Sequence, residues 1–134
     1  FKYSTIGDNT QENREWLEKV GNVNFDYNFK GTHIISYWSE RYKNNYYQCV
    51  TYHELISLRM YESSVNCIGN SPLFKAVSAM REDGDFGQLF ECKDGLFICQ
   101  HETSREHIDK WCKGWDVTGL KKYNLPELQE KFKL

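Results

Sequence analysis

The feature that most constrains the fold is a change of side-chain pattern along the chain, from helix-like spacing to strand-like composition and back. Between residues 25 and 62 the chain is rich in Tyr, Ile, Val and Thr, which favour strands because they pack well on a pleated surface. Lys43-Asn44-Asn45 supplies one turn in this region, because asparagine tolerates a positive φ. We expect an antiparallel meander of four strands: Phe25–Phe29, Thr32–Tyr42, Tyr46–His53 and Leu55–Glu62.

Helix-like segments lie on both sides of this meander. The first is Gln11–Val20, which carries an apolar stripe and can be capped by Asp8, Asn9 or Thr10. Three more helices are predicted from a capping residue followed by an apolar stripe, and they start at Ser71-Pro72, at Thr103 and at Asn124.

A hairpin follows the second helix, with Gln88–Cys92 and Leu96–His101 as its strands and Asp94-Gly95 as a type I′ turn. This register makes Cys92 and Cys99 diagonal neighbours, with Cα atoms about 7–8 Å apart. Because that separation exceeds normal disulfide reach, we expect no bond between Cys92 and Cys99.

The order of these elements predicts an α+β fold, with about four helices packed on a mainly antiparallel sheet. Aromatic residues make up 16% of the chain, which also favours a sheet-containing globule. With 134 residues, no linker and no repeat, residues 1–134 are expected to form a single compact domain.

Five cysteines favour an oxidising compartment, although a cytosolic protein can carry free thiols. The chain begins at Phe1 without an initiator Met, as a processed secreted chain would. We therefore expect a secreted protein stabilised by at most two intramolecular bridges. Cys112 can reach one cysteine of the hairpin, and two others can clip the meander. The disulfide candidates are Cys49, Cys67, Cys92, Cys99 and Cys112.

Charge and motifs exclude several function classes. A formal charge of -2 gives no strong field for binding nucleic acid or an anionic membrane, and no stretch approaches the ~20 apolar residues of a spanning helix. There is no P-loop, no nucleophile elbow and no zinc-ligand spacing, so we expect no metal and no cofactor. The densest polar cluster, around His101 and His107, matches a capping box with solvent-facing neighbours.

One face of the meander is the predicted binding site. With Asn44-Asn45 as the loop, Glu40 lies opposite Cys49, and Trp38, Tyr42 and Tyr47 share an exposed sheet face. The opposite face has the better apolar centre, with Ile35, Tyr37, Val50 and Tyr52, and is expected to pack against a helix. An alternative is that the three aromatic side chains also pack beneath a helix. If they are exposed, a protein partner is the first expectation, and single-stranded RNA or a carbohydrate ring could also stack there.

The same face carries a catalytic alternative. Glu40 and His53 could act as general base and acid in phosphodiester cleavage, with Arg41 or His101 assisting. Small secreted microbial ribonucleases use such residues on an antiparallel sheet packed on a helix, and this element order resembles that plan in outline. The expected register, however, separates Glu40 from His53 by about 13 Å along the strand.

A short motif is similar to one in a known effector family. Tyr47-Gln48-Cys49 matches the aromatic-x-Cys signature of ribonuclease-like effectors secreted by powdery mildew fungi, in which it lies near the mature N-terminus. Here it lies in the middle of the chain, and Phe90-Glu91-Cys92 and Phe97-Ile98-Cys99 satisfy the same pattern. The match therefore assigns no family.

Together these patterns predict a small secreted binding protein, of the effector, toxin-partner or inhibitor kind, rather than an enzyme. The alternative is a secreted ribonuclease-like hydrolase, or a catalytically dead effector of that type. The sequence leaves the partner and the oligomeric state open.

Overall fold

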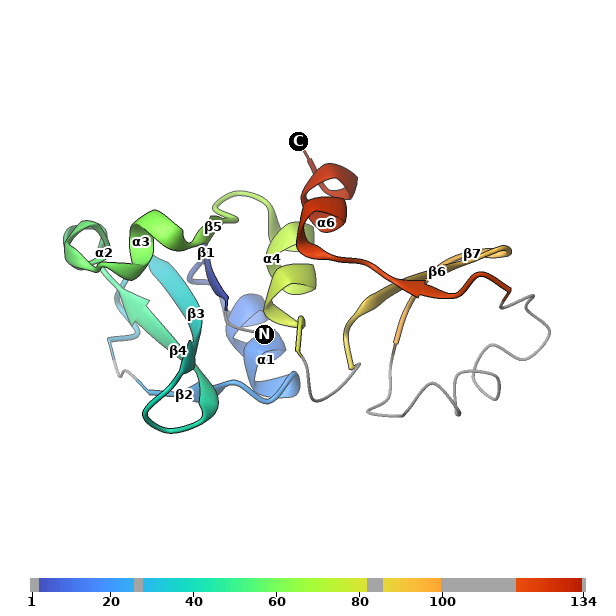
Figure 1. Ribbon diagram of the computed structural model, residues 1–134. Coiled ribbons are helices and arrows are strands. Elements are labelled where there is room, and N and C mark those ends of the chain that lie inside the picture. The colour runs from blue at the N-terminus through green and yellow to red at the C-terminus, as the bar shows by residue number, and fades with distance from the viewer. Residues whose placement is uncertain (1–2, 26–27, 82–85, 100–117, 134) are drawn as a thin grey trace.

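The computed structural model describes residues 3–25, 28–81, 86–99 and 118–133. Within them the chain has mixed α and β content, with one five-stranded mixed sheet and one three-stranded antiparallel sheet. Helices α1 (Gln11–Lys19) and α4 (Ser71–Ser78) lie between the two sheets, and α6 (Leu125–Lys131) lies beside α4 (Figure 1). The α+β class is confirmed.

The larger sheet has the strand order β2-β4-β3-β1-β5. Its three central strands are linked antiparallel, whereas each edge strand is only two residues long and pairs parallel to its neighbour. The sheet is therefore mixed rather than a pure meander. The strands are β1 (Ser4–Asp8), β2 (Val23–Asn24), β3 (His33–Ser39), β4 (Asn44–Val50) and β5 (Val65–Asn66).

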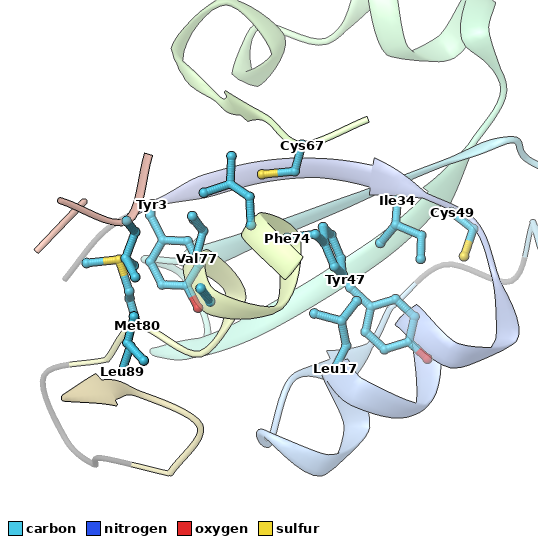
Figure 2. Packing of buried hydrophobic residues seen from close by; sticks show 13 residues of the cluster. Tyr3, Leu17, Ile34, Tyr47, Cys49, Cys67, Phe74, Val77, Met80 and Leu89 are labelled. Atoms are coloured by element: carbon cyan, nitrogen blue, oxygen red, sulfur yellow. The ribbon is translucent and has the colours of Figure 1, made fainter. Parts of the chain in front are cut away.

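The main core lies between this sheet and the helices α1 and α4. Figure 2 shows Ile34 and Tyr47 from the sheet converging with Leu17 and Phe74 from the two helices. All four side chains are almost completely removed from water, and burial of large apolar groups is the dominant favourable term in folding.

A smaller core covers part of the other face. Ile35 and Val50 pack there against Leu55 of α2 (Tyr52–Ser57) and Met60 of α3 (Met60–Ser63). These two short helices lie at the end of the sheet where His33 pairs with Val50. The expectation that the face with Ile35 and Val50 packs against a helix is thus confirmed at the Val50 end of that face.

Local capping explains where three predicted helices begin. Thr10 accepts a hydrogen bond from the backbone of Asn13 at the start of α1, and Asn124 forms a capping box with Glu127 at the start of α6. Helix α4 is capped by Asn70 rather than by Ser71, which becomes its first residue. The fourth predicted helix, from Thr103, lies outside the described residues.

The second sheet contains the predicted hairpin in a different register. Strands β6 (Leu89–Cys92) and β7 (Gly95–Ile98) are joined by Lys93-Asp94, and β8 (Lys121–Lys122) pairs with β6. Phe90 pairs with Phe97, and their rings stack with centroids 5.6 Å apart. The turn is one residue earlier than expected, so each cross-strand partner shifts by two residues.

Three expectations for the meander are wrong. The segment Leu55–Glu62 contains the end of α2 and most of α3 instead of a strand, because Thr51 caps α2 and ends β4. The register of β4 with β3 also differs, because the turn is formed by residues 40–43 and not by Asn44-Asn45: Cys49 pairs with Ile34 rather than with Glu40, a shift of six residues. An even shift keeps each side chain on its predicted face, so the division into two faces stands. Phe25–Phe29 is not a strand over its described residues, and β2 ends just before it.

The first strand was not anticipated from the sequence. β1 lies between β3 and β5, and its Ile6 is fully buried. Gly7 in this strand allows close approach of α4, since a Cβ at that position would overlap the ring of Phe74.

Disulfide stabilisation is not supported by the structure. No disulfide bond joins any two of the described cysteines Cys49, Cys67, Cys92 and Cys99, and Cys112 lies outside the described residues. The thiol of Cys67 instead lies 3.0 Å from the hydroxyl of Thr5, and burial raises the pKa of Cys67 to about 11. The expectation that Cys92 and Cys99 do not bond each other is confirmed.

Candidate binding surface

The predicted binding residue Tyr47 belongs to the core. Only 1% of it is exposed, and its hydroxyl donates a hydrogen bond of 3.4 Å to Glu18 of α1. Burial, followed by the nearby Glu18 carboxylate, raises the pKa of Tyr47 to about 12. The prediction of an exposed Tyr47 is wrong, because α1 and α4 cover the face that had been expected to face solvent.

Trp38 and Tyr42 do not form a single surface with Tyr47. Trp38 lies half-buried on the same face as Tyr47, near the end of β3 where it pairs with Asn45. Tyr42 lies in the four-residue turn between β3 and β4 and is 52% exposed. Of the three predicted aromatic residues, Tyr42 is the one most open to solvent.

Tyr42 contributes to a different cluster, which we call the aromatic patch: Phe25, Tyr37, Tyr42 and Tyr46. Tyr46 lies at its centre, with ring centroids 5.1 Å from Phe25, 5.4 Å from Tyr42 and 6.4 Å from Tyr37. Phe25 also meets Tyr37 edge-on at 6.1 Å. Such aromatic contacts fix the rings relative to one another.

Strand register and helix coverage together create this patch. Tyr37 pairs directly with Tyr46, so both point to the face that carries Ile35 and Val50. Helices α2 and α3 cover that face only at its Val50 end (Figure 1). The parallel strand β2 places Val23 next to Tyr46 and delivers Phe25 beside it, so the other end of the face is aromatic and open.

Charged groups border the patch on the turn. The guanidinium of Arg41 lies 5.2 Å from the centroid of the Tyr42 ring, which is within cation–π range. Lys43 and Glu40 form an ion pair of 2.9 Å, so their charges compensate each other. Arg41 makes no ion pair with a described residue, which leaves one positive charge at the rim.

The residues of the catalytic alternative are not brought together. Glu40 lies in the turn at one end of the β3–β4 hairpin, whereas His53 lies in the first turn of α2, beyond the opposite end of β4. The six residue steps along β4 alone amount to about 20 Å, so one phosphate cannot contact both side chains. Arg41 lies beside Tyr42. His101 lies outside the described residues.

The described residues form neither a metal site nor a membrane-spanning helix. Among residues 3–25, 28–81, 86–99 and 118–133, no group of three His, Cys, Asp or Glu side chains could hold a metal ion. None of the helices described is long and apolar enough to cross a membrane.

Three members of the patch were not identified as binding residues from the sequence. Tyr37 had been placed on the correct face but beneath a helix, and Tyr46 begins a predicted strand without being assigned a role. The sequence signal that could have identified these two residues is the concentration of aromatic residues close to a turn. Phe25 could not be placed, because its contact with Tyr46 depends on the parallel pairing of β2 with β4.

Comparison with known proteins adds no further constraint: no protein-family model, no curated protein and no solved structure matches this chain.

Proposed function

We propose that this chain is a binding protein that recognises a protein partner through the aromatic patch. The observation that carries this role is a cluster of four rings on a sheet face that the described helices leave open, in which Tyr46 contacts each of the other three and Phe25 and Tyr42 are 42% and 52% exposed. Contiguous exposed apolar surface commonly marks an interaction site. Tyrosine and arginine are also enriched among the residues that dominate binding energy.

The ring geometry favours a protein over a row of stacked bases or sugars. All four ring contacts are tilted or edge-on, with interplanar angles of 84°, 59°, 35° and 69°. Stacking of successive bases needs ring faces that are open and accessible one after another. Rings tilted against one another instead give an uneven apolar surface, which suits interdigitation with side chains.

The charges at the rim suggest the chemistry of the partner surface. An apolar centre would pack on Phe25 and Tyr46, and a carboxylate would face the guanidinium of Arg41, which has no ion-pair partner in the described part of the chain. Complementary charge of this kind contributes more to association rate and specificity than to affinity. The role does not depend on secretion, for which the absence of a disulfide among the described cysteines removes one argument.

The test uses the full chain as bait for proteins from candidate source material, compared with two variants. Tyr42→Ala removes an exposed ring of the patch, and Tyr52→Ala removes an even more exposed tyrosine from α2, where it lies outside the patch. A specific partner should be retained by the wild-type and Tyr52→Ala chains. It should bind the Tyr42→Ala chain at least about 30-fold more weakly, as for a hot-spot side chain worth 2 kcal/mol.

Thermal unfolding provides the control for folding. Both variants should unfold within a few degrees of the wild type, because both side chains are exposed. If no protein distinguishes the wild-type chain from the Tyr42→Ala chain, the patch is not a binding surface. Cleavage of RNA by the purified chain, abolished in His53→Ala, would instead establish the hydrolase alternative.

A further inference from the structure

A second candidate site lies away from the aromatic patch, where α1, α4, the β6–β7 hairpin and the end of α6 meet. It is a pocket of about 670 Å³, within the range of about 300–1,000 Å³ that is usual for small-molecule sites. Most of its lining is apolar and comes from segments far apart in the sequence. The apolar walls are formed by Trp16, Pro72, Ala76, Leu89, Ile98 and Phe132.

The wall formed by Trp16 is held in place before any ligand binds. The indole Nε1 donates a hydrogen bond of 3.0 Å to the carbonyl of Lys75, and the ring stacks on Phe86 with centroids 6.2 Å apart. Gly87 packs directly on the same ring, since a Cβ there would lie 3.0 Å from Cζ2. Because these three contacts already hold the indole ring in place, it loses little conformational freedom when a ligand binds, and this favours affinity.

Three charged side chains contribute to the lining of the pocket: Glu12, Lys19 and Lys75. Lys75 is paired with Glu12, so these two charges compensate each other. Lys19, in the last turn of α1, forms no ion pair with a described residue. The hydroxyl of Ser71 is occupied by a hydrogen bond to Asn13. Among the described residues, the pocket therefore combines apolar walls with one positive charge, that of Lys19, that has no ion-pair partner.

We propose that this pocket binds a small amphipathic carboxylic acid, whose apolar body lies against Trp16 and Ile98 and whose carboxylate meets Lys19. A sugar or nucleotide would bury several polar groups against walls that offer them no partners, which is costly. A cationic ligand would be repelled by Lys19. A chain or ring with a single carboxylate satisfies both the apolar walls and the charge of Lys19.

The experiment uses two probes with the same ten-carbon chain and opposite charge, decanoate and decylammonium, each below its micelle concentration. Binding to the full chain is followed by NMR of the tryptophan indole N–H signals, with the Trp16 signal assigned from Trp16→Phe. Decanoate should shift the Trp16 signal saturably and bind more tightly than decylammonium. Lys19→Gln should weaken the binding of decanoate by about two- to fivefold, as expected for an exposed ion pair. It should also narrow the difference in affinity between decanoate and decylammonium.

Matched variants separate the pocket from general surface binding. Lys30→Gln removes a lysine that does not line the pocket and should leave decanoate binding unchanged. Ile98→Asp should weaken the binding of decanoate at least about tenfold, because the new carboxylate would be buried against the hydrocarbon chain of the ligand. Ile56→Asp on α2 should not change the binding of decanoate. Both isoleucines are half-exposed, so both variants should fold.

Three results would overturn the assignment. The first is the absence of a saturable shift of the Trp16 signal with decanoate. The second is equal binding of decanoate by the wild-type and Ile98→Asp chains, and the third is tighter binding of decylammonium. Since Tyr42 does not line the pocket, Tyr42→Ala should bind decanoate normally, and loss of partner binding in that variant is a separate result.

Discussion

Replacing Gly7 with alanine tests how tightly β1 packs against α4. Phe74 is fully buried in the main core (Figure 2). A Cβ built on Gly7 would lie 2.9 Å from Cγ of Phe74 and closer still to Cδ2 and Cε2. Carbon atoms in favourable contact are about 3.5–4.0 Å apart, so either the ring or the helix must move.

The expected cost follows from two opposing effects. Overpacking of a well-filled core costs about 1–3 kcal/mol, whereas replacing glycine by alanine restricts the unfolded chain and returns about 0.4–1 kcal/mol. Because three ring atoms are involved, we expect Gly7→Ala to lower the free energy of unfolding by about 2 kcal/mol. Urea unfolding should show a lower midpoint with an unchanged slope.

A double-mutant cycle identifies Phe74 as the cause. Phe74→Leu removes part of the ring, so the double variant should be more stable than the sum of the single effects by about 1 kcal/mol. Gly69→Ala is the control: Gly69 has a φ of +77° and nothing within 4 Å of its added Cβ, so its cost should simply add to that of Phe74→Leu. Wild-type stability of Gly7→Ala, or strict additivity with Phe74→Leu, would refute the close packing of β1 on α4.

Two further outcomes follow from buried or capping groups. The pKa of Tyr47, about 12, exceeds its ordinary value of 10.0, so the unfolded chain loses this proton first and stability should fall between pH 10 and pH 12, by at most about 1.4 kcal/mol per pH unit. Chemical unfolding over this range should show a smaller fall in Tyr47→Phe, and identical profiles would contradict the buried hydroxyl. Thr51→Ala removes the side-chain cap of α2 and should cost about 1 kcal/mol in urea unfolding, whereas Thr51→Ser, which keeps the hydroxyl, should cost much less. Equal losses in the two Thr51 variants would mean that the cap does not stabilise α2.

The sequence was most informative where the physical cause is local. Caps at Thr10 and Asn124 satisfy backbone groups within one turn, so the starts of α1 and α6 could be read directly. A local signal was also overlooked: Thr51 and Glu54 form the capping box that turns the expected strand into α2. Recognising it would have ended β4 at Val50.

The candidate site depended much more on long-range packing. Alternation along a strand separates Tyr46 from Tyr47 without revealing which face the helices cover. In the folded chain α1 and α4 cover Tyr47, while α2 and α3 leave Tyr46 open. Of the predicted binding residues, only Tyr42 belongs to the patch, and it lies in the turn between β3 and β4 rather than in the strand that was expected to include it.

The sequence by itself therefore determined the α+β class, the starts of α1 and α6, and the assignment of side chains to the two faces of the β3–β4 hairpin. Tertiary structure decided the strand register, the buried face and the neighbours of each exposed ring. The physical reason is range: capping and alternation act within a few residues, whereas the contact of Phe25 with Tyr46 and the pocket beside Trp16 exist only after distant segments have packed together.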